Sequence, residues 1–424
     1  MELRVASAAE RIEADESMVI AGGILPRFAK GREGELRATA VALRLGDETV
    51  CLVSCDVLML RREDLDRVCE RAEAELGLPR SNLLIASTHT HHAPSTVRIH
   101  GYSEEPLFLG RVREAILGAV SKACEGLSDA PPVRALFRLG IESSVGQNSR
   151  LLLGDGTIYW VGPRDDAIRP TGPFDPDLPV IAFERPDGKL EALIFSHSTH
   201  NIGARRGNVI SPGFYGLAAQ ELEGELGCRV AFLPGAFGSS HNLTLSTDEM
   251  VHRIKEAVEE ALSKAEEMKV DRLRSIKEEF EFRVRRFDEE REEEAVSYYC
   301  RRRLADPEPV IEVFRGMRRE LAGRQGEVRR SWLQVVSIGD VKLVGVPGEM
   351  FTSLGIDLKR RSPFRYTFPI SLANDWIGYI PDEKAFELGG YQVWTGFHSF
   401  VERGTGEMIV ERALEMLKRL GGEG

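Results

Sequence analysis

The sequence has no long hydrophobic run. No stretch approaches the roughly 18 consecutive apolar residues that a membrane-spanning helix requires. The N-terminal segment, MELRVASAAERIEADES, is charged throughout and has no apolar centre of the kind found in signal peptides. We therefore expect no integral membrane segment, no signal peptide and, by default, a cytoplasmic location.

An excess of positive charge is also missing. The chain has 56 Lys and Arg against 67 Asp and Glu, a formal net charge of -11 at pH 7. This balance opposes broad attraction to phosphate backbones or anionic lipid, so we expect no nucleic-acid partner. The six cysteines are scattered without a CxxC pair. Their scatter argues against a disulfide scaffold or a thiolate zinc site and favours buried, reduced cysteines.

The composition that is present is that of a soluble globular protein. Of 424 residues, 42% are hydrophobic and 29% are charged. This length is enough for two domains or for one large enzyme-sized core. We find no internal repeat, no low-complexity linker and no firm domain boundary, so the residues alone leave both possibilities open.

Strands and helices alternate in the first third of the chain. Apolar, β-branched runs predict strands over 38–45, 50–60 and 82–87. Residues 62–76 and 108–126 place apolar side chains at helical spacing. This alternation predicts an α/β fold class.

The rest of the chain continues the pattern with two exceptions. Residues 140–179 are rich in Gly, Pro and Asp and predict irregular loops. Residues 270–330 carry mixed-sign charge runs with sparse apolar positions, which predicts surface helices. The other predicted strands are 134–142, 180–184, 190–198, 228–233, 332–338 and 342–347, and the other predicted helices are 215–226, 250–268, 352–361 and 405–420.

Three short segments at predicted strand ends hold most of the histidines. The first, THTHHAP, has three histidines in four residues, His89, His91 and His92. Imidazole is a common zinc ligand, and strand ends are where α/β proteins place functional groups. If the strand geometry continued, His89 and His91 would point the same way. The alternative is a hydrogen-bonding loop without a metal.

The second segment, SHSTHN, offers His197 and His200, which have opposite parity on a strand, so we expect only one to face a shared site. The third, PGAFGSSHN, is a Gly-flanked turn whose Ser240 and His241 are suited to bind an oxyanion or supply a nucleophile. A simple polar turn explains it equally well, because its spacing is not that of the GxSxG elbow.

Two later segments each add one polar group at a predicted strand end. Glu349 stands in VGVPGEMF, just before a predicted helix, where a lone carboxylate is usually a surface or helix-dipole residue. Tyr379 stands in NDWIGYIP and is followed by Tyr391 in GGY. Without further information, tyrosines at such positions are more often structural than catalytic.

The order of these segments resembles the N-terminal catalytic domain of the neutral/alkaline ceramidase family and its bacterial relatives. The resemblance runs from about residue 5 to about residue 417 and rests on THTHHAP, a strand ending in histidine, the Gly-rich turn, PGE and GYIP in that order. It implies mixed β-sheets flanked by helices. It also implies amide hydrolysis with one catalytic zinc ion held by two His, one Glu and one Tyr.

The resemblance assigns roles to individual residues. The first His of its THTH segment matches His89, a zinc ligand, and the second matches His91, which lies beside the metal and contacts substrate. Its remaining acidic and phenolic ligands match Glu349 and Tyr379. A later tyrosine that lines the pocket matches Tyr391.

The second histidine ligand has two candidates. The spacing to Ser211 is 11 residues from His200 and 14 from His197, and the shorter spacing is nearer that of the family. We therefore assign His200 as the ligand and keep His197 as the alternative.

Other family positions are altered. The nucleophilic serine matches Ser240 or, in a different alignment, His241. The family's Asn-Arg pair becomes Asn148 followed by Ser149, with Arg150 one place later. A family aspartate is replaced by Gly213. With this resemblance we expect one catalytic domain over residues 1–424, without the C-terminal immunoglobulin-like domain of secreted ceramidases.

The leading hypothesis is a zinc-dependent hydrolase that cleaves an amide or similar acyl bond of a small-molecule substrate. The predicted ligands are His89, His200, Glu349 and Tyr379, and the nucleophile is metal-activated water or Ser240. His91 and His241 are the candidates for general acid/base catalysis, and Tyr391 for positioning substrate or stabilising the oxyanion. The alternatives are a metal-dependent hydrolase of a small polar or carbohydrate-derived substrate and a noncatalytic metal- or ligand-binding relative.

Overall fold

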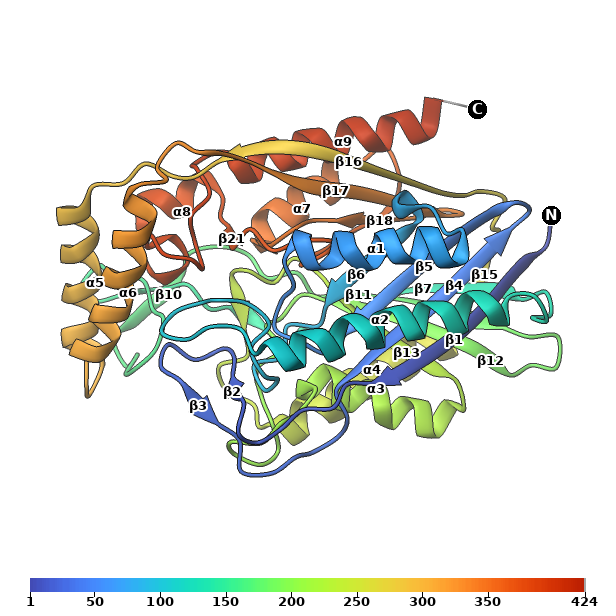
Figure 1. Ribbon diagram of the computed structural model, residues 1–424, viewed down its shortest axis with the longest axis horizontal. Coiled ribbons are helices and arrows are strands. Elements are labelled where there is room, and N and C mark those ends of the chain that lie inside the picture. The colour runs from blue at the N-terminus through green and yellow to red at the C-terminus, as the bar shows by residue number, and fades with distance from the viewer. Residues whose placement is uncertain (423–424) are drawn as a thin grey trace.

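Three β-sheets form the framework of the protein in a computed structural model that describes residues 1–422 (Figure 1). The first sheet has the order β1 (Leu3–Arg11), β4 (Arg37–Leu45), β5 (Glu48–Cys55), β6 (Leu83–Ser87). The second has the order β13 (Arg229–Pro234), β12 (Leu190–His197), β11 (Asp177–Glu184), β7 (Arg134–Ile141), β15 (Glu266–Met268). The third has the order β16 (Leu273–Arg283), β17 (Val328–Ile338), β18 (Val341–Gly345), β20 (Tyr366–Ile370).

Each sheet has its own helical cover. Helices α1 (Arg62–Leu76) and α2 (Pro106–Gly126) pack on the first sheet, and α3 (Gly213–Leu226) and α4 (Thr247–Ser263) pack on the second. The third sheet shares a hydrophobic cluster with α5 (Glu289–Arg303), α6 (Glu308–Ala322), α7 (Thr352–Arg361) and α9 (Thr405–Gly422). The short elements are β2 (Val19–Ile20), β3 (Arg27–Phe28), β8 (Gln147–Asn148), β9 (Leu151–Leu153), β10 (Ala167–Pro170), β14 (Ser240–His241), β19 (Glu349–Met350), β21 (Tyr379–Ile380) and α8 (Glu383–Leu388).

The inner faces of the three sheets meet in one hydrophobic cluster. In strand β4, side chains point alternately to the two faces of the sheet. Ala38, Ala40 and Ala42 lie in the cluster with α2, whereas Val41 and Leu43 lie between the sheets. The small alanines let the helix approach closely, and the larger residues fill the space between the sheets. Both faces of the strand are therefore buried.

Each sheet contains one parallel pair of strands: β5 with β6, β12 with β13, and β18 with β20. The other pairings within the three sheets are antiparallel. In α/β proteins, functional groups gather beyond the carboxyl ends of parallel strands. The segments that follow β6, β12, β13, β18 and β20 carry the histidine, serine, glutamate and tyrosine motifs.

The predicted α/β class with mixed sheets and flanking helices is confirmed. Several boundaries were wrong. The strand expected to reach residue 60 ends at Cys55, and the helix expected over 250–268 ends at Ser263 and is followed by β15. Residues 140–179 include β8, β9 and β10 besides loops.

The charged segment 270–330 is helical only in part. Near its start lies the edge strand β16, which pairs with β17 along its whole length. Phe280 and Phe282 are buried, and the intervening Glu281 is exposed. Charged side chains on the open side of an edge strand discourage pairing with other chains, so the mixed charges mark a strand as well as two surface helices.

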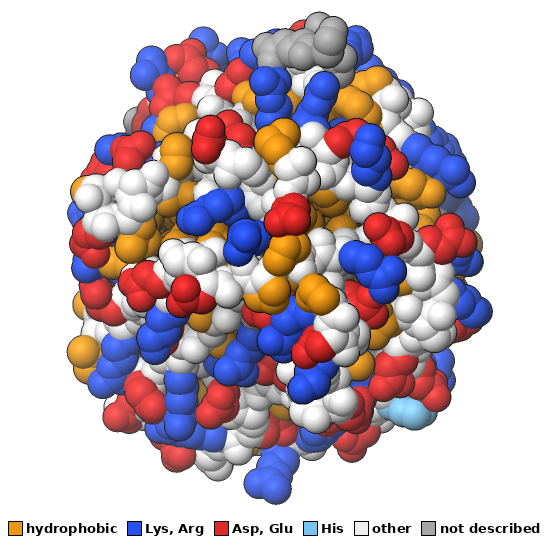
Figure 2. All heavy atoms as spheres, turned by 90° about the vertical axis from the view of Figure 1, so that its right-hand side faces the viewer, with side chains coloured by type: hydrophobic (Ala, Val, Ile, Leu, Met, Phe, Trp, Pro, Cys, Tyr) orange, Lys and Arg blue, Asp and Glu red, His pale blue; other side chains and the backbone are white. Residues whose placement is uncertain are grey.

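The surface and the cysteines agree with the composition. Figure 2 shows acidic and basic side chains intermixed over one face, without a field of one sign. Within residues 1–422, all six cysteines are free, and only Cys124 is not buried. No helix in this range combines the length and apolar character needed to cross a bilayer.

A buried carboxylate holds the loop that leads from β20 to Tyr379. Asp375 Oδ1 accepts hydrogen bonds from the backbone N–H groups of Arg62 and Trp376, each at 2.7 Å, and Oδ2 accepts one from the Ser331 hydroxyl at 2.6 Å. Burial raises the pKa of Asp375 from 3.8 to about 6. The folded protein therefore binds this proton more tightly than the unfolded chain does.

The pH dependence of stability should reflect this proton. The stabilisation of the folded protein by the proton on Asp375 is complete below about pH 3.8, the pKa of this group in the unfolded chain. It is lost as the pH rises through about 6, its pKa in the folded protein. Relative to Asp375→Asn, which binds no such proton, the wild type should lose about 3 kcal/mol of unfolding free energy across that range. Urea denaturation of both proteins at a series of pH values measures the difference. Parallel pH profiles for the two proteins would contradict the assignment.

Candidate metal centre

His89 follows β6 and turns the chain sharply. Its φ is +62°, a left-handed conformation that is uncommon and costly for a non-glycine residue. The strand ends at Ser87, so strand geometry does not continue to His91, and the turn at His89 brings the two side chains together instead. His89 Nδ1 lies 2.9 Å from the Leu58 carbonyl oxygen, to which it donates a hydrogen bond. In the neutral ring this hydrogen bond leaves the lone pair on Nε2, which faces the neighbouring side chains.

His91 lies next to His89 and is held in the same way. Its Nδ1 is 3.2 Å from the Gly22 carbonyl oxygen, and its Nε2 is 3.3 Å from His89 Nε2. Gly22 has a φ of +93°, and a Cβ atom there would lie 2.4 Å from His91 Nδ1. A side chain at position 22 would thus displace the His91 ring.

His200 joins this pair from the segment after β12. Its Nδ1 lies 3.0 Å from the Ser240 carbonyl oxygen, and its Nε2 lies 3.2 Å from Glu349 Oε2 and 3.0 Å from the Tyr379 hydroxyl. The ring is 1% exposed. The structure therefore brings His200, and not His197, to the other polar groups.

His197 is a fully buried histidine with both nitrogens in use. Nδ1 lies 2.6 Å from the Tyr215 hydroxyl, and Nε2 lies 2.9 Å from the Glu142 carbonyl oxygen. The ring also packs edge-on against Phe174. No nitrogen of His197 remains to bind a metal. Strand parity does not explain the difference between the two histidines, because β12 ends at His197 and His200 lies in the loop that follows.

Glu349 and Tyr379 come from two short strands that pair directly. They are register partners in the parallel pair β19–β21. Glu349 Oε2 lies 3.4 Å from His89 Nε2, and Trp376 Nε1 donates to Oε1 at 3.4 Å. Burial alone would raise the pKa of Glu349, but the adjacent His89 and His200 rings outweigh it and hold that pKa well below its usual value. The carboxylate is thus charged although it is buried.

These five side chains fit a metal cation. His89, His91 and His200 each use Nδ1 to hold a backbone carbonyl, so three Nε2 lone pairs and a carboxylate face one another in a buried space. Ligand atoms about 2.0–2.1 Å from a tetrahedral zinc ion lie roughly 3.3 Å apart. The neighbouring donor atoms here lie 3.0–3.4 Å apart.

Two donor sets are available, and they share His89 and His200. One adds His91, whose ligand atom lies within 4.8 Å of the other two histidines. The other adds Glu349 and Tyr379, as the resemblance implies. Burial, followed by the nearby His89 and His200 rings, lowers the pKa of His91 well below its ordinary value, so that the ring is neutral.

Two solved structures share this arrangement of elements. Neutral ceramidase from Pseudomonas aeruginosa matches with a TM-score of 0.75 and 17% sequence identity, over 99% of this chain and 75% of that one. A ceramidase complexed with C2 matches with a TM-score of 0.77 and 16% identity, over the same shares. The chain has the neutral ceramidase fold. No protein-family model and no curated protein matches the sequence.

Within this ceramidase-like fold, Ser240 and His241 lie beside the histidine cluster in different ways. Ser240 is fully buried, and its hydroxyl lies 2.8 Å from the Thr352 hydroxyl. In the described residues its side chain forms no hydrogen bond with a histidine. The His241 ring stacks on His200 with centroids 3.8 Å apart, and burial lowers its pKa well below the ordinary value.

Tyr391 belongs to an aromatic layer next to the cluster. Its hydroxyl lies 3.1 Å from His100 Nε2, and its ring stacks between Trp160 and His398, at 4.6 and 4.5 Å. It meets the Tyr379 ring edge-on at 5.8 Å. The sequence pattern did not indicate His100, His398 and Trp160 because each stands alone in the chain. Their only sequence signal was the residue type.

Arg150 and Gly213, where the sequence departs from the ceramidase pattern, both have structural contacts in this protein. Arg150 is 2% exposed and donates to the Gln392 side chain and the Gly389 carbonyl, and burial lowers its pKa to about 10. A Cβ atom at Gly213 would lie 2.2 Å from Asn201 Oδ1. The Asn201 side chain therefore occupies the space next to the position where the family has an aspartate.

Proposed function

We propose that this protein is a zinc-dependent hydrolase that cleaves an amide or similar acyl bond of a small-molecule substrate. The observation that carries the proposal is the convergence of three histidine Nε2 atoms with a charged, buried carboxylate and a phenol. The fold similarity to ceramidases agrees with this reaction class. The zinc ligands in the proposal are His89, His200, Glu349 and Tyr379.

A zinc ion bound there would polarise the scissile carbonyl and make water more acidic. The chain's own residues orient and neutralise the site. The carbonyl groups of Leu58 and Ser240 fix the His89 and His200 rings in one tautomer. Burial, with the Glu349 charge adding to it, raises the pKa of the Tyr379 hydroxyl well above its ordinary value, so that it remains a neutral phenol.

His91 and His241 are the partly exposed histidines of the cluster, and we propose that substrate approaches past them. Both rings are neutral because burial lowers their pKa values, so each is able to accept a proton during attack, His91 at Nε2, and return it to the leaving nitrogen. His91 Nε2 already faces His89. We assign the general acid/base role to one of these two histidines.

The test is metal content together with hydrolysis. Wild type should purify with close to one equivalent of zinc, lose hydrolysis of a short N-acyl amine on chelation and regain it with zinc. Glu349→Gln should bind zinc less tightly because it removes the buried charge. His252→Gln is the matched control, since His252 is exposed on α4, away from the cluster, and pairs with Glu256. Metal-free protein with full activity would refute the zinc assignment.

Ser240→Ala should retain hydrolysis within about threefold of wild type, because the Ser240 hydroxyl is bound to Thr352 and water is the proposed nucleophile. Ser239→Ala is the matched control, since Ser239 also bonds Thr352. Steady-state kinetics with one N-acyl amine measures both variants. Loss of activity in Ser240→Ala with zinc retained would instead identify Ser240 as the nucleophile.

A substrate other than ceramide is the second candidate. Arg150 is engaged by Gln392 and Gly389, and Gly213 carries no carboxylate, so two polar groups of the family's site are missing from the cluster. Turnover of short or carbohydrate-derived N-acyl amines, with no turnover of ceramide in detergent, would select this candidate. Stoichiometric metal without turnover of any acyl substrate would indicate a noncatalytic relative.

A further inference from the structure

The consecutive carbonyl groups of Gly22 and Gly23 hold two histidines in the same way. The Gly22 carbonyl oxygen lies 3.2 Å from His91 Nδ1, and the Gly23 carbonyl oxygen lies 3.1 Å from His100 Nδ1. Because a carbonyl group has no proton to donate, His100 carries a proton on Nδ1. Burial lowers the pKa of His100 from 6.5 to about 4. At neutral pH the His100 ring is therefore neutral, with a lone pair on Nε2.

His100 stands at the tip of a tight turn that fixes its position. Ile99 and Tyr102 exchange two backbone hydrogen bonds, at 3.2 and 3.3 Å, and His100 between them has a φ of +52°. This left-handed conformation is costly for a non-glycine residue and persists only where the surrounding contacts maintain it. The Tyr102 hydroxyl also donates to the Gly23 carbonyl at 3.0 Å. These contacts hold the His100 ring with Nε2 toward Tyr391.

The hydrogen bond between Tyr391 and His100 has one possible direction. The Tyr391 hydroxyl lies 3.1 Å from His100 Nε2. Burial, followed by the Glu349 charge, raises the pKa of Tyr391 well above its ordinary value, so its side chain is a neutral phenol with one proton. Because His100 Nε2 has only a lone pair, the phenol is the donor. The Tyr391 oxygen is then left to meet any further group as an acceptor.

This acceptor lies next to the proposed zinc ligands. The Tyr391 ring meets the Tyr379 ring edge-on at 5.8 Å, and the Glu349 charge acts on both Tyr391 and His100. In the described part of the chain, the Tyr391 hydroxyl has no hydrogen-bond partner besides His100. The ceramidase resemblance implies that the tyrosine at this position lines the substrate pocket. The unused lone pairs of the phenol are therefore available to a substrate.

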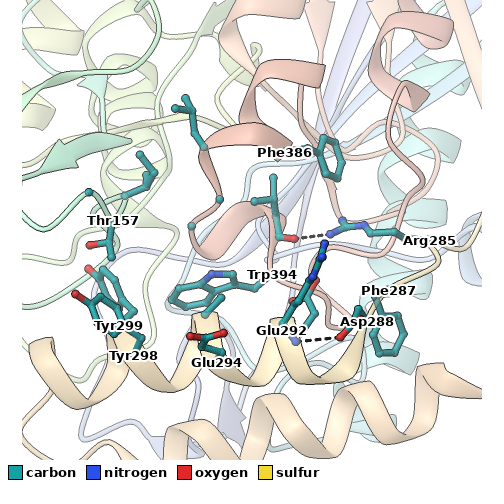
Figure 3. Close-up of a pocket in the computed structure, with 18 of the residues that line it drawn as sticks. Thr157, Arg285, Phe287, Asp288, Glu292, Glu294, Tyr298, Tyr299, Phe386 and Trp394 are labelled. Carbon is teal, nitrogen blue, oxygen red and sulfur yellow. Dashed lines mark hydrogen bonds between the residues drawn. The ribbon is translucent and has the colours of Figure 1, made fainter.

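The loop that carries Tyr391 is fastened from behind. The buried Arg285 donates to the Ser399 hydroxyl at 2.8 Å. Glu292 of α5 accepts hydrogen bonds from the Thr395 backbone N–H at 2.9 Å and from its hydroxyl at 2.8 Å. Arg285 and Glu292 both line the pocket shown in Figure 3, which Tyr391 does not line. The contacts of this loop are thus in place without a substrate.

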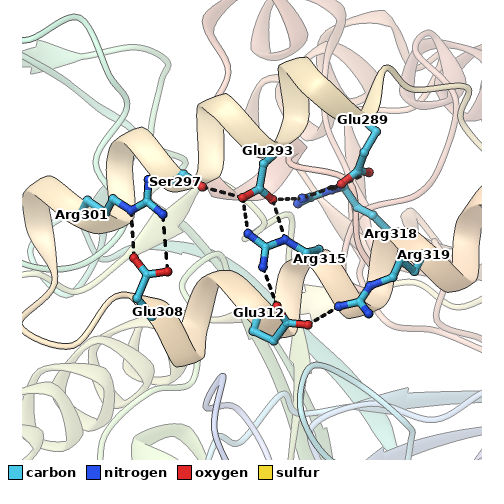
Figure 4. A network of polar contacts seen from close by, with 9 residues as sticks. All are labelled: Glu289, Glu293, Ser297, Arg301, Glu308, Glu312, Arg315, Arg318 and Arg319. Atoms are coloured by element: carbon cyan, nitrogen blue, oxygen red, sulfur yellow. Dashed lines mark hydrogen bonds and ion pairs between the residues drawn. The ribbon is translucent and has the colours of Figure 1, made fainter.

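Helices α5 and α6 support the aromatic layer. Phe314 of α6 meets the Tyr391 ring edge-on at 6.2 Å, and the Tyr299 hydroxyl of α5 accepts a hydrogen bond from the Trp160 backbone N–H at 2.8 Å. The two helices are joined by arginine–glutamate pairs, which are Arg301 with Glu308, Arg315 with Glu293, and Arg318 with Glu289 and Glu293 (Figure 4). Support of this kind keeps a binding group in position before its ligand arrives.

We propose that His100 makes Tyr391 a hydrogen-bond acceptor for the N–H of the scissile amide, so that the site selects secondary amides over tertiary amides. This selection rests on the amide hydrolysis proposed above. His100 is a positioning residue, because it acts through Tyr391. A site built to bond an N–H group rejects an analogue that lacks it, since a buried polar group is then left unpaired. In this arrangement an oxyanion receives no hydrogen bond from Tyr391.

Hydrolysis of N-butylhexanamide and of N-butyl-N-methylhexanamide by the zinc-loaded full chain tests the selection. The kcat/KM ratio of the secondary to the tertiary amide should be about tenfold lower in Tyr391→Phe than in wild type, the worth of one hydrogen bond. His100→Phe keeps an aromatic ring but no acceptor, and it should lower the ratio equally. His100→Gln should retain the wild-type ratio, because its side chain offers both an acceptor and a donor. A purely structural role would slow both amides equally.

Nitrogen NMR of the histidine-labelled protein tests the direction of the hydrogen bond without any turnover. We expect the His100 signals, assigned by their absence in His100→Gln, to show the proton on Nδ1, and the Nε2 signal to move in Tyr391→Phe. A proton on Nε2, or an unchanged kcat/KM ratio in Tyr391→Phe, would overturn the proposal and leave amide hydrolysis intact. Hydrolysis of neither amide by the zinc-loaded wild type would refute the proposed function, and the selection with it.

Discussion

His200→Ala is expected to purify without stoichiometric zinc and to hydrolyse an N-acyl amine roughly a thousandfold more slowly than wild type. The reason is that a zinc ion contributes several kcal/mol of charge stabilisation in the transition state. His200 Nε2 lies within 3.2 Å of both Glu349 Oε2 and the Tyr379 hydroxyl. Its loss would remove the proposed zinc ligand that lies next to both of these oxygen atoms. Metal analysis and steady-state kinetics on the same preparation measure the effect.

His197→Ala is the matched control, because His197 lies three residues earlier and is equally buried. It should lose about 2–5 kcal/mol of unfolding free energy, since it leaves the Tyr215 hydroxyl and the Glu142 carbonyl unpaired and opens a cavity. The folded fraction should still bind zinc. If His197→Ala lost zinc while His200→Ala retained it, the assignment of the second histidine would be reversed.

Gly238→Ala is expected to destabilise the fold by about 3 kcal/mol or more and to impair zinc binding. A Cβ atom at position 238 would lie 2.2 Å from the Glu349 carbonyl oxygen and 2.8 Å from its carbon, both backbone atoms that cannot move aside cheaply. The Gly238 N–H also donates to the Met350 carbonyl at 2.8 Å. If the added methyl group pushed the turn at Gly238 away from β19, this hydrogen bond would be lost as well. Thermal unfolding with and without added zinc measures both effects.

Gly224→Ala provides the comparison for that substitution. Gly224 lies in α3, and no atom comes within 4 Å of the Cβ that alanine would add. The change should be neutral or stabilise the protein by up to about 1 kcal/mol, because glycine is unfavourable inside a helix. Equal effects of the two substitutions would show that the contact between Gly238 and Glu349 does not limit the site.

The sequence predicted those parts of the fold in which the hydrophobic periodicity and the residues that terminate helices and strands agree. Helices α1 and α7 have the expected boundaries. Gly77 ends α1, and in α7 the buried residues recur at helical spacing while the charged residues lie on the other face. It failed for β16, where alternating glutamate and phenylalanine stood within a region of mixed charge. The charge pattern of a solvated face is shared by helices and edge strands, so it did not distinguish them.

The candidate site was predictable one residue at a time. Clustering at strand ends and the family resemblance selected His89, His91, His200, Glu349 and Tyr379, and the structure brings these five together. The sequence did not reveal that the Ser240 hydroxyl turns to Thr352, because a serine looks the same in a sequence whichever way its side chain points. The aromatic layer of Trp160, Tyr391 and His398 joins distant segments and left no local pattern.

The origin of the donors in three different sheets has a consequence for biosynthesis. His89 follows the first sheet, His200 the second, and Glu349 and Tyr379 the third, so the donor set spans most of the chain. Contacts between residues so far apart in sequence form late, after the costly closure of long loops. A chain still emerging from the ribosome cannot complete this set until β21 has been made, and the histidines released earlier remain without their carboxylate. Capture of the ion would therefore mark the end of folding rather than guide its beginning.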